Sequence, residues 1–273
     1  MVRNILALCC ILSLLLVSGC TTKQNSSSHP FPSGRLIDLT HDFSSETIYW
    51  PTSDPFVSET VFSGITDKGF FYAAYKFCTA EHGGTHIDAP IHFSSGKKTV
   101  DQISLEQLVG EAVIIDISEK ALANRDYQVN TEDFTAWESA NGKIPSNSIV
   151  LLYTGYSQYW PDRVKYMGTD KRGPEAVKEL HFPGLHPEAA KWLVGNRKIS
   201  AIGLDTPSID YGQSQLFESH QILFEQNIPA FENVTNLDKL PSKGALVIAL
   251  PMKIKEGSGG PLRIIALVPD ENK

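Results

Sequence analysis

The chain has 273 residues, of which 41% are hydrophobic and 20% are charged, and its formal net charge is −7. This composition is typical of a globular protein with enough apolar residues for a substantial core, and the length favours one domain. Acidic residues are spread along the chain and no basic stripe occurs, which argues against a nucleic acid as partner.

The first twenty residues differ from the rest of the chain. Arg3 precedes an apolar run from Ile5 to Val17, which is shorter than the roughly 20 residues that a membrane-spanning helix needs. This pattern predicts a secretory signal peptide over residues 1–19. The run ends in "VSGC", which resembles the lipobox of bacterial lipoproteins and implies a lipid on Cys20. A plain signal peptide or an N-terminal anchor is the alternative.

Residues 20–34 are polar, Ser-rich and interrupted by prolines, a composition that predicts a flexible tether. The lipid on Cys20 would make a membrane the partner of this segment and place the protein outside the cytoplasm. An acid directly after the lipidated cysteine would favour the inner membrane. Thr21 is not an acid, so the sequence favours the outer membrane, facing the periplasm. Cys78 would then be the one cysteine left unmodified, so we expect no intramolecular disulfide and an inert, packed thiol.

Short apolar runs alternate with helical patterns over residues 35–273, which we expect to form the folded domain. Continuous apolar runs are typical of strands buried on both faces, and Ser104 and Thr131 are helix-capping residue types. In chain order the pattern predicts strands at 35–40, 70–80, 111–118, 147–154, 199–205, 244–254 and 261–269, and helices at 104–110, 131–140, 186–196 and 214–227. This alternation indicates a single layered α/β domain.

The segment "EHGGTHIDAPIHF", residues 81–93, holds three of the eight histidines of the chain. Its two glycines and Pro90 make a helix improbable. In an extended segment the even-numbered side chains point one way and the odd-numbered ones, such as Ile87 and Ile91, point the other way into the core. The even-numbered polar set is His82, His86, Asp88 and His92.

Four polar side chains on one buried side need a common partner, because burying unpaired polar groups is costly. Imidazole nitrogens and a carboxylate oxygen suit a divalent metal, zinc first and manganese second. Gly83 and Gly84 would let the backbone approach the metal or a substrate closely. The alternative is a set of histidines that are each hydrogen-bonded separately, but four such groups within eleven residues favour a shared cation.

Residues 82–92, "HGGTHIDAPIH", resemble the signature of the cyclase family of metal-dependent hydrolases, His-x-Gly-Thr-His-x-Asp-x-Pro-x-His, at every fixed position. The family includes bacterial kynurenine formamidase and isatin hydrolase. Blocks such as "FPGLHPEAAKWL" and "AIGLDTPSID" extend the resemblance across most of residues 35–269. The resemblance implies a swivelling β/β/α fold with a mixed sheet core and flanking helices. It also implies a homodimer or homotetramer.

His220 and Glu232 match the late histidine and glutamate of the family, although alone neither would stand out. The resemblance implies that they complete a site for one or two metal ions. The implied ligands are His82, His86, Asp88, His92, His220 and Glu232. With one metal bound, His92 and His220 would be free for proton transfer or substrate contact.

The implied activity is hydrolysis of a small amide, either a cyclic amide or an N-formyl aryl amine. A bound metal lowers the pKa of water from about 15.7 towards about 7, and a nearby base must then transfer the proton to the leaving nitrogen. His92 is the expected catalytic base and Glu232 the alternative. Tyr153 stands where many formamidases have arginine, which puts the identity of the substrate in doubt.

The remaining candidates carry weaker signals. Four aromatic residues could line a substrate pocket, although aromatic side chains more often pack in the core: Tyr49, Trp50, Phe70 and Phe71. We expect turn or structural hydrogen-bonding roles for His41, Asp42, Asp205, Ser208 and Asp210. Neither a Gly-x-Ser-x-Gly elbow nor a P-loop lysine occurs.

Two other classes of function stay open at this point. The first is a non-catalytic lipoprotein that binds a metal or a small ligand, but the exposed His-rich or acidic tracts of metal carriers do not occur in residues 35–273. The second is a structural periplasmic domain. Both would lack turnover of amides.

Overall fold

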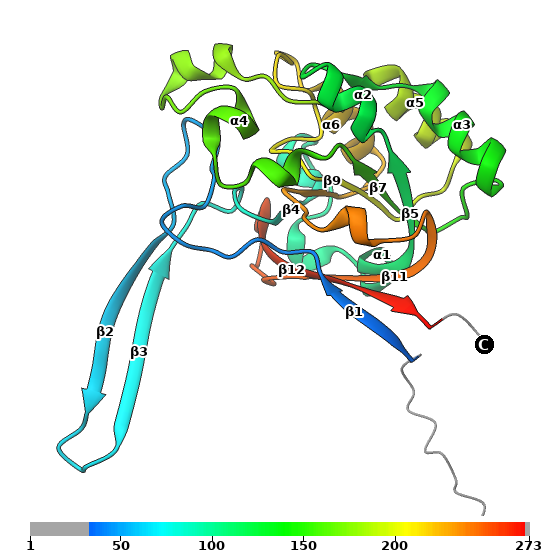
Figure 1. Cartoon of the computed structure of the whole chain (residues 1–273). Coiled ribbons are helices and arrows are strands. Elements are labelled where there is room, and N and C mark those ends of the chain that lie inside the picture. Colours follow the sequence, from blue (N-terminus) through cyan, green and yellow to red (C-terminus); the bar gives the residue numbers. More distant parts are fainter. Residues whose placement is uncertain (1–32, 271–273) are drawn as a thin grey trace, which may run out of the picture. The chain divides into compact units, whose positions relative to one another are not determined.

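The computed structural model describes residues 33–270 (Figure 1). The predicted signal peptide at 1–19, Cys20 and nearly all of the tether at 20–34 therefore lie outside the described residues. Within the described part, no helix has the length and apolar character needed to cross a membrane. These residues form a single α/β domain built on a mixed sheet, as the sequence predicts.

Eight strands form the main sheet in the order β1-β12-β11-β5-β7-β9-β10-β4. Neighbours from β5 to β10 run parallel, and all other pairings are antiparallel. The strands are Gly34–Asp38 (β1), His86–Asp88 (β4), Val109–Asp116 (β5), Ile149–Tyr153 (β7), Ala201–Leu204 (β9), Ala230–Glu232 (β10), Lys243–Pro251 (β11) and Gly259–Pro269 (β12). A two-stranded sheet of Gln128–Val129 (β6) and Gly184–Leu185 (β8) lies apart from it.

The main sheet closes on itself, because β4 pairs with β10 along one edge and with β12 along the other. All eight strands contribute side chains to one apolar core, for example Ile87, Val247 and Ile264. The apolar runs of β5, β7 and β9 are continuous because these strands are buried on both faces. The core inside the closed sheet fixes β4, which carries the histidine motif.

Helices cover the outer face of the parallel strands and form a second apolar core with it (Figure 1). In this core Val113 and Ile115 of β5 meet Phe134 and Leu193. The helix at 131 is capped one residue earlier than predicted, since the Asn130 side chain accepts a hydrogen bond from the Asp133 backbone N–H. The helices are Leu105–Leu108 (α1), Ser118–Ala123 (α2), Thr131–Asn141 (α3), Arg163–Met167 (α4), Pro187–Asn196 (α5) and Glu218–Glu225 (α6).

Strands β2 (Val57–Ile65) and β3 (Phe71–Cys78) form a separate antiparallel hairpin that projects from the domain (Figure 1). We call residues 57–78 the arm. The arm shares no pairing with the main sheet. Cys78, at the end of the arm, is exposed, so the expectation of a packed thiol is wrong.

All seven predicted strands and all four predicted helices are present, with ends displaced by at most four residues. The elements that the sequence pattern does not predict are short or lie outside the cores. The strand β2 mixes polar and apolar residues because both of its faces are exposed, and β4 is only three residues long.

Candidate metal centre

The site is built around β4, where His86 and Asp88 point to one side and Ile87 points into the closed sheet. The predicted two-residue period holds only over these three residues. His82 lies in the bend before β4, and His92 ends a short 3-10 helix, Pro90–His92. The backbone therefore brings these four side chains together by three different local conformations and not by one extended strand.

The two glycines of the motif make room for aromatic rings. A Cβ on Gly83 would lie 2.0 Å from the Tyr49 ring, and one on Gly84 would lie 2.7 Å from the Phe43 ring. Gly84 also has a φ of +58°, which favours glycine. Both glycines thus let the chain pack closely against Tyr49 and Phe43, and Gly83 also lies in the wall of the cavity described below.

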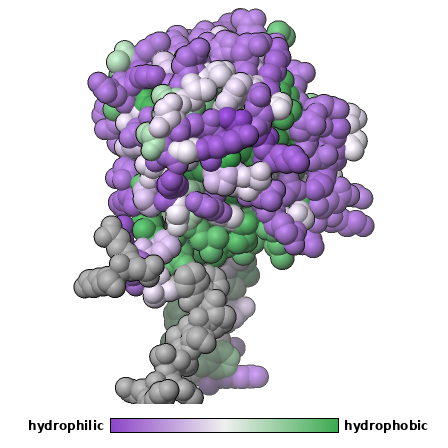
Figure 2. Space-filling view, turned by 90° about the vertical axis from the view of Figure 1, so that its right-hand side faces the viewer, coloured by the Kyte–Doolittle hydropathy of each residue, from purple (hydrophilic) through white to green (hydrophobic). Residues whose placement is uncertain are grey.

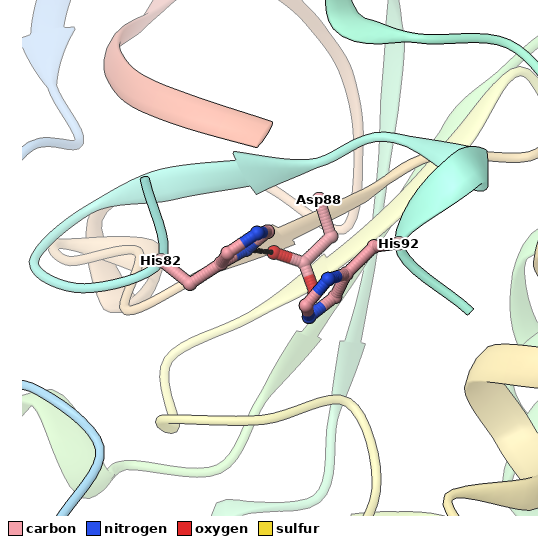
Figure 3. A group of neighbouring side chains, drawn as sticks. All are labelled: His82, Asp88 and His92. Carbon is pink, nitrogen blue, oxygen red and sulfur yellow. Dashed lines mark hydrogen bonds and ion pairs between the residues drawn. The ribbon is translucent and has the colours of Figure 1, made fainter. Parts of the chain in front are cut away.

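The carboxylate of Asp88 is the centre of the cluster. Its Oδ1 lies 2.6 Å from His82 Nδ1 and 3.0 Å from His86 Nε2. Its Oδ2 lies 3.3 Å from His220 Nε2 and 3.9 Å from His92 Nε2. Figure 3 shows the side chains of His82 and His92 next to this carboxylate. The two imidazole rings also stack on each other, with their centroids 3.7 Å apart.

Glu232 and His220 reach the cluster from β10 and α6. Glu232 pairs with His86 across the antiparallel β10–β4 ladder, and its Oε2 lies 3.4 Å from His86 Nε2. Its Oε1 accepts a hydrogen bond from the Ile209 backbone N–H at 2.7 Å and lies 3.1 Å from His220 Nε2. The six side chains that the sequence singles out thus converge in one place.

Hydrogen bonds on the far side of two rings fix which nitrogen faces the cluster. His86 Nδ1 donates to the Gly84 carbonyl at 2.9 Å. His220 Nδ1 lies 2.6 Å from Asp210 Oδ2, and Asp210 also accepts from the backbone N–H groups of Ser219 and His220. Both histidines therefore present Nε2 to Asp88 and Glu232, as histidine ligands do when a second group holds the other nitrogen.

Burial and mutual charge shift the pKa values of these groups in opposite directions. Burial alone would raise the pKa of Asp88, but the charge of His82 and the hydrogen bonds of its neighbouring histidines hold it well below its usual range. Burial, followed by the charge of Asp88, raises the pKa of Glu232. Burial opposes protonation of His86 and His220, yet the surrounding carboxylates raise both pKa values.

The donor set fits a divalent cation. The ligand atoms of His82, Asp88 and His92 lie within 4.8 Å of one another, and so do those of His86, Asp88 and Glu232. Two buried carboxylates demand positive charge nearby, and the raised pKa values of His86 and His220 reflect that demand. Imidazole nitrogen and carboxylate oxygen are the ligand types of zinc and manganese sites.

His92 differs from the other imidazoles of the cluster. Its side chain is 30% exposed, and its nearest carboxylate oxygen is the 3.9 Å contact to Asp88. Burial lowers its pKa to about 4 against the opposing charge of Asp88. His92 is therefore neutral at pH 7 and has a free nitrogen that can accept a proton.

A cavity of about 250 Å³ opens above the cluster, and aromatic side chains form much of its wall. Tyr49 and Trp50 line it, as the sequence analysis expects. Phe70 and Phe71 do not line it, because they lie at the turn of the arm and the start of β3. The chain instead contributes Phe93 and Phe217, whose rings are 5.3 Å apart.

Sequence reasoning did not single out Phe93 and Phe217. Phe93 directly follows the motif, and that adjacency was its only signal. Phe217 precedes α6 with a φ of 51°, which an aromatic residue rarely adopts, and its ring faces Trp50 at 6.2 Å. Nothing in the local sequence indicates this conformation.

Among the residues expected to have structural roles, His41, Asp205 and Asp210 make packing or hydrogen-bonding contacts, whereas Ser208 lines the cavity. His41 lies outside the cavity and stacks on Trp160 at 4.2 Å. Asp205 accepts hydrogen bonds from the backbone N–H and the hydroxyl of Thr154. Asp210 holds the ring of His220 through the hydrogen bond between His220 Nδ1 and Asp210 Oδ2.

The fold is a closed mixed sheet with covering helices, and a buried cluster of histidines and acids lies at the floor of a cavity. These features define the class of the protein, an α/β protein with a candidate metal centre. Residues 37–211 match the family model described as "Putative cyclase". The chain is 32% identical to the isatin hydrolase of Roseibium aggregatum over 246 residues, which is 87% of this chain and 88% of that protein. The protein belongs to the cyclase family.

Other relatives agree with this assignment. The kynurenine formamidase of Bacillus cereus is 30% identical over 84% of this chain and 95% of its own length. Among solved structures, isatin hydrolase A from Ralstonia solanacearum has a TM-score of 0.78 at 33% identity, over 86% of this chain and 92% of that one. An isatin hydrolase bound to the product analogue thioisatinate has a TM-score of 0.77 at 29% identity, with 86% and 92% covered.

Proposed function

We propose that the protein is a metal-dependent amidohydrolase that opens a small cyclic amide or cleaves an N-formyl aryl amine. One observation carries the proposal: six histidine and acid side chains converge at the floor of an aromatic cavity. The names of the relatives support the same reaction class, since isatin is a cyclic amide and formylkynurenine is an N-formyl aryl amine.

The residues with fixed orientation are those best suited to hold the metal. His86, Asp88 and Glu232 form one buried group of candidate ligands, and His220 faces the same two carboxylates. His82 and His92 form the more exposed group around Asp88. When bound, zinc or manganese supplies a Lewis acid that polarises a carbonyl and lowers the pKa of water to about 7.

Proton transfer falls to His92 in this proposal. The imidazole of His92 is neutral at pH 7, because burial holds its pKa at about 4, and its unprotonated nitrogen can take a proton from water and return it to the leaving nitrogen. Glu232, the alternative base, is more constrained: Oε1 already accepts the Ile209 N–H, and the whole side chain is only 4% exposed.

The cavity wall selects the substrate. Trp50, Phe93 and Phe217 provide ring faces and edges around the space above the ligands. Flat aromatic groups bind such walls by offset or edge-on stacking. A benzene ring fused to or carrying the amide is therefore the expected substrate class, and the apolar wall would also exclude bulk water from the reacting carbonyl.

The test joins metal analysis to a substrate panel. The purified protein, stripped with a chelator and reloaded with Zn²⁺ or Mn²⁺, is assayed on isatin, N-formylkynurenine, formanilides, unfused lactams and lactones. We expect turnover of aryl amides only in the metal-loaded form. His92→Ala is expected to lower kcat by about 10²–10⁴-fold with metal retained.

The matched control is His181→Ala, since His181 is also partly exposed but pairs with Asp126 away from the cavity. Full activity is expected for this variant. Absence of turnover on every compound, despite a full metal complement, would overturn the enzymatic proposal and favour a protein that only binds a metal or small ligand.

We also propose, from the sequence alone, that Cys20 is lipidated and that the domain is tethered outside the cytoplasm, at the outer membrane facing the periplasm. The support is the "VSGC" ending of the predicted signal peptide and the polar residues 20–34. Mass spectrometry of the mature N-terminus, with Cys20→Ser as the control, tests this proposal: a free N-terminus at any other residue contradicts it.

A further inference from the structure

The glycine-rich stretch "GSGG", residues 257–260, lies against the cluster around Asp88, although it contributes none of the six candidate ligands. Gly259 pairs with Asp88 across the β12–β4 ladder. The Ser258 carbonyl accepts a hydrogen bond from the Ala89 backbone N–H at 2.8 Å. The backbone therefore fixes Ser258 beside the histidine motif, and its side chain can act on that motif.

The glycines on either side of Ser258 make room for two neighbouring side chains. A Cβ on Gly259 would lie 2.6 Å from His82 Cε1, and one on Gly257 would lie 2.8 Å from Glu81 Oε1. Carbon atoms pack best at about 3.5–4.0 Å, so glycine is the residue that allows both approaches. Residues 257–259 thus form a cradle for the ring of His82 and the carboxylate of Glu81.

The Ser258 side chain joins these two groups. The hydroxyl and the backbone N–H of Ser258 both donate to Glu81 Oε2, at 2.6 and 3.0 Å. The same hydroxyl oxygen lies 2.8 Å from His82 Nε2, and His82 Nδ1 lies 2.6 Å from Asp88 Oδ1. A continuous chain of contacts therefore runs from Glu81 through Ser258 and His82 to Asp88.

The direction of these hydrogen bonds fixes the tautomer of His82. A carboxylate only accepts hydrogen bonds, and a hydroxyl has one proton to donate, which Ser258 gives to Glu81. The Ser258 oxygen is then an acceptor towards His82, so His82 Nε2 carries a proton. In the neutral ring the proton-free nitrogen is therefore Nδ1, which faces Asp88 and is available to a metal.

His82 depends on such support more than the two deeply buried histidines of the cluster. Its side chain is 23% exposed, against 3% for His86 and 2% for His220. The bonds to the Gly84 carbonyl and to Asp210 turn Nε2 of those two rings towards the carboxylates. Ser258 holds the opposite nitrogen of His82, and His82 accordingly presents Nδ1.

We propose that Ser258 and Glu81 are positioning residues that keep His82 Nδ1 free of a proton and aimed at the metal. The inference rests on the metal centre of the proposed function but not on turnover of any substrate. Metal affinity, which is measured without a substrate, therefore separates the failure of this inference from the failure of the proposed reaction.

The test measures the Zn²⁺ affinity of the purified full chain by competition with a chromogenic chelator. Ser258→Ala is expected to weaken Zn²⁺ binding by about 10–100-fold. In a His82→Ala background the same substitution should change the affinity by less than about threefold, because Ser258 acts through His82. A merely structural role of Ser258 would weaken binding equally in both backgrounds.

Two substitutions of Glu81 test the direction of the hydrogen bonds. Glu81→Gln keeps an oxygen that can accept both Ser258 bonds, so the Zn²⁺ affinity should stay close to that of the natural protein. Glu81→Leu frees the Ser258 hydroxyl to donate to His82 Nε2, which favours the tautomer with its proton on Nδ1. Binding should then weaken by about tenfold or more, although Ser258 is unchanged.

Long-range ¹H–¹⁵N NMR of the Zn²⁺-loaded natural protein reads the tautomer directly, and we expect the His82 proton on Nε2. A proton on His82 Nδ1 would overturn the proposal without any variant. Unchanged Zn²⁺ affinity in Ser258→Ala, or an equal loss of affinity in the His82→Ala background, would overturn it as well.

The matched controls are two other serine-to-alanine variants. The buried Ser148 hydroxyl donates to the Pro145 carbonyl at 2.8 Å, outside the cavity. Ser63 is exposed on the arm, whose hydrophobic side chains lie below the domain in Figure 2. Ser148→Ala and Ser63→Ala should both bind Zn²⁺ like the natural protein, and circular dichroism should show the same secondary structure for all variants.

Discussion

The cluster around Asp88 and the arm depart from the usual distribution of side chains in opposite directions. The cluster buries charge: Asp88, Glu232, His86 and His220 are each at most 3% exposed. The arm exposes aromatic and aliphatic side chains, up to 67% in Ile65. Buried polar groups and large exposed apolar patches are the two informative exceptions to ordinary burial.

The difference shows that the two regions depend on different interactions. Buried carboxylates need a positive charge, which a cation at the cluster would supply. The arm shares no pairing with the main sheet, which holds the cluster. A variant in one region should therefore leave the other region intact, and this independence is what the following experiments probe.

The largest effect is expected from Asp88→Asn. The amide keeps the shape of the side chain but removes the charge on which four histidines converge. We expect kcat/KM on an aryl amide substrate to fall by at least about 10³-fold, or roughly 4 kcal/mol, and metal content to fall with it. Activity within tenfold of the natural protein would contradict this expectation, because it would mean that the buried charge of Asp88 does not bind a cation.

A buried imidazole without a carboxylate bonded to it provides the next test. Burial lowers the pKa of His41 to about 4, against the charge of Asp42, so the unfolded chain takes up this proton at higher pH than the folded one. The folded protein therefore keeps its full stability above pH 6.5, the ordinary pKa of histidine. As the pH falls from 6.5 to about 4, the free energy of unfolding decreases by at most about 3 kcal/mol.

Urea unfolding at pH 7 and pH 4.5 measures this loss. His41→Gln should remove that part of the pH dependence. Equal pH profiles for the natural protein and His41→Gln would contradict the expectation.

Asp210→Asn is expected to have a smaller effect through His220. Asp210 bonds His220 Nδ1 at 2.6 Å and so aims Nε2 at the two carboxylates. Loss of such a supporting group costs about 10–100-fold in metal affinity, measured by competition with a chromogenic chelator. Asp205→Asn, whose NH2 group cannot accept the hydrogen bond of the Ser157 backbone N–H, should lower stability without changing metal affinity. If both variants change affinity equally, Asp210 has no positioning role.

The smallest effect is expected on the arm itself. Glu59 and Lys76 form an exposed pair, and such pairs contribute about 0–1 kcal/mol. Glu59→Gln should change the unfolding free energy, measured by urea unfolding, by less than about 1 kcal/mol and leave turnover of an aryl amide unchanged. A loss of turnover would mean that the arm and the cluster are not independent.

Much of the site was predictable because it is local in sequence. The histidine motif compresses four of the six converging side chains into eleven residues. His220 and Glu232 carried no such signal, since a histidine on a helix and a glutamate on a short strand are common. Their role depends on the β10–β4 pairing and on Asp210, which only the folded chain brings together.

The fold was predictable where strands are buried on both faces and not where they are short or exposed. The runs in β5, β7 and β9 are continuous because neighbours cover both sides. Closure of the sheet rests on three residue pairs between β4 and β12, and no local pattern encodes a contact over that separation. Of the arm, the sequence predicts only the strand at 70–80 and not β2. The reason is that the apolar residues of the arm do not point into a core.

The pairing between β4 and β12 has one more consequence for the cluster around Asp88. Asp88 lies opposite Gly259, and His82 bonds Ser258, so the cluster is completed only by residues near the end of the chain. A product that stops short of residue 258 would lack β12, which pairs with β4 on the side opposite β10 and also joins β1 to β11. His86 and Asp88 can therefore be held between two strands only after nearly all of the described residues have been synthesised.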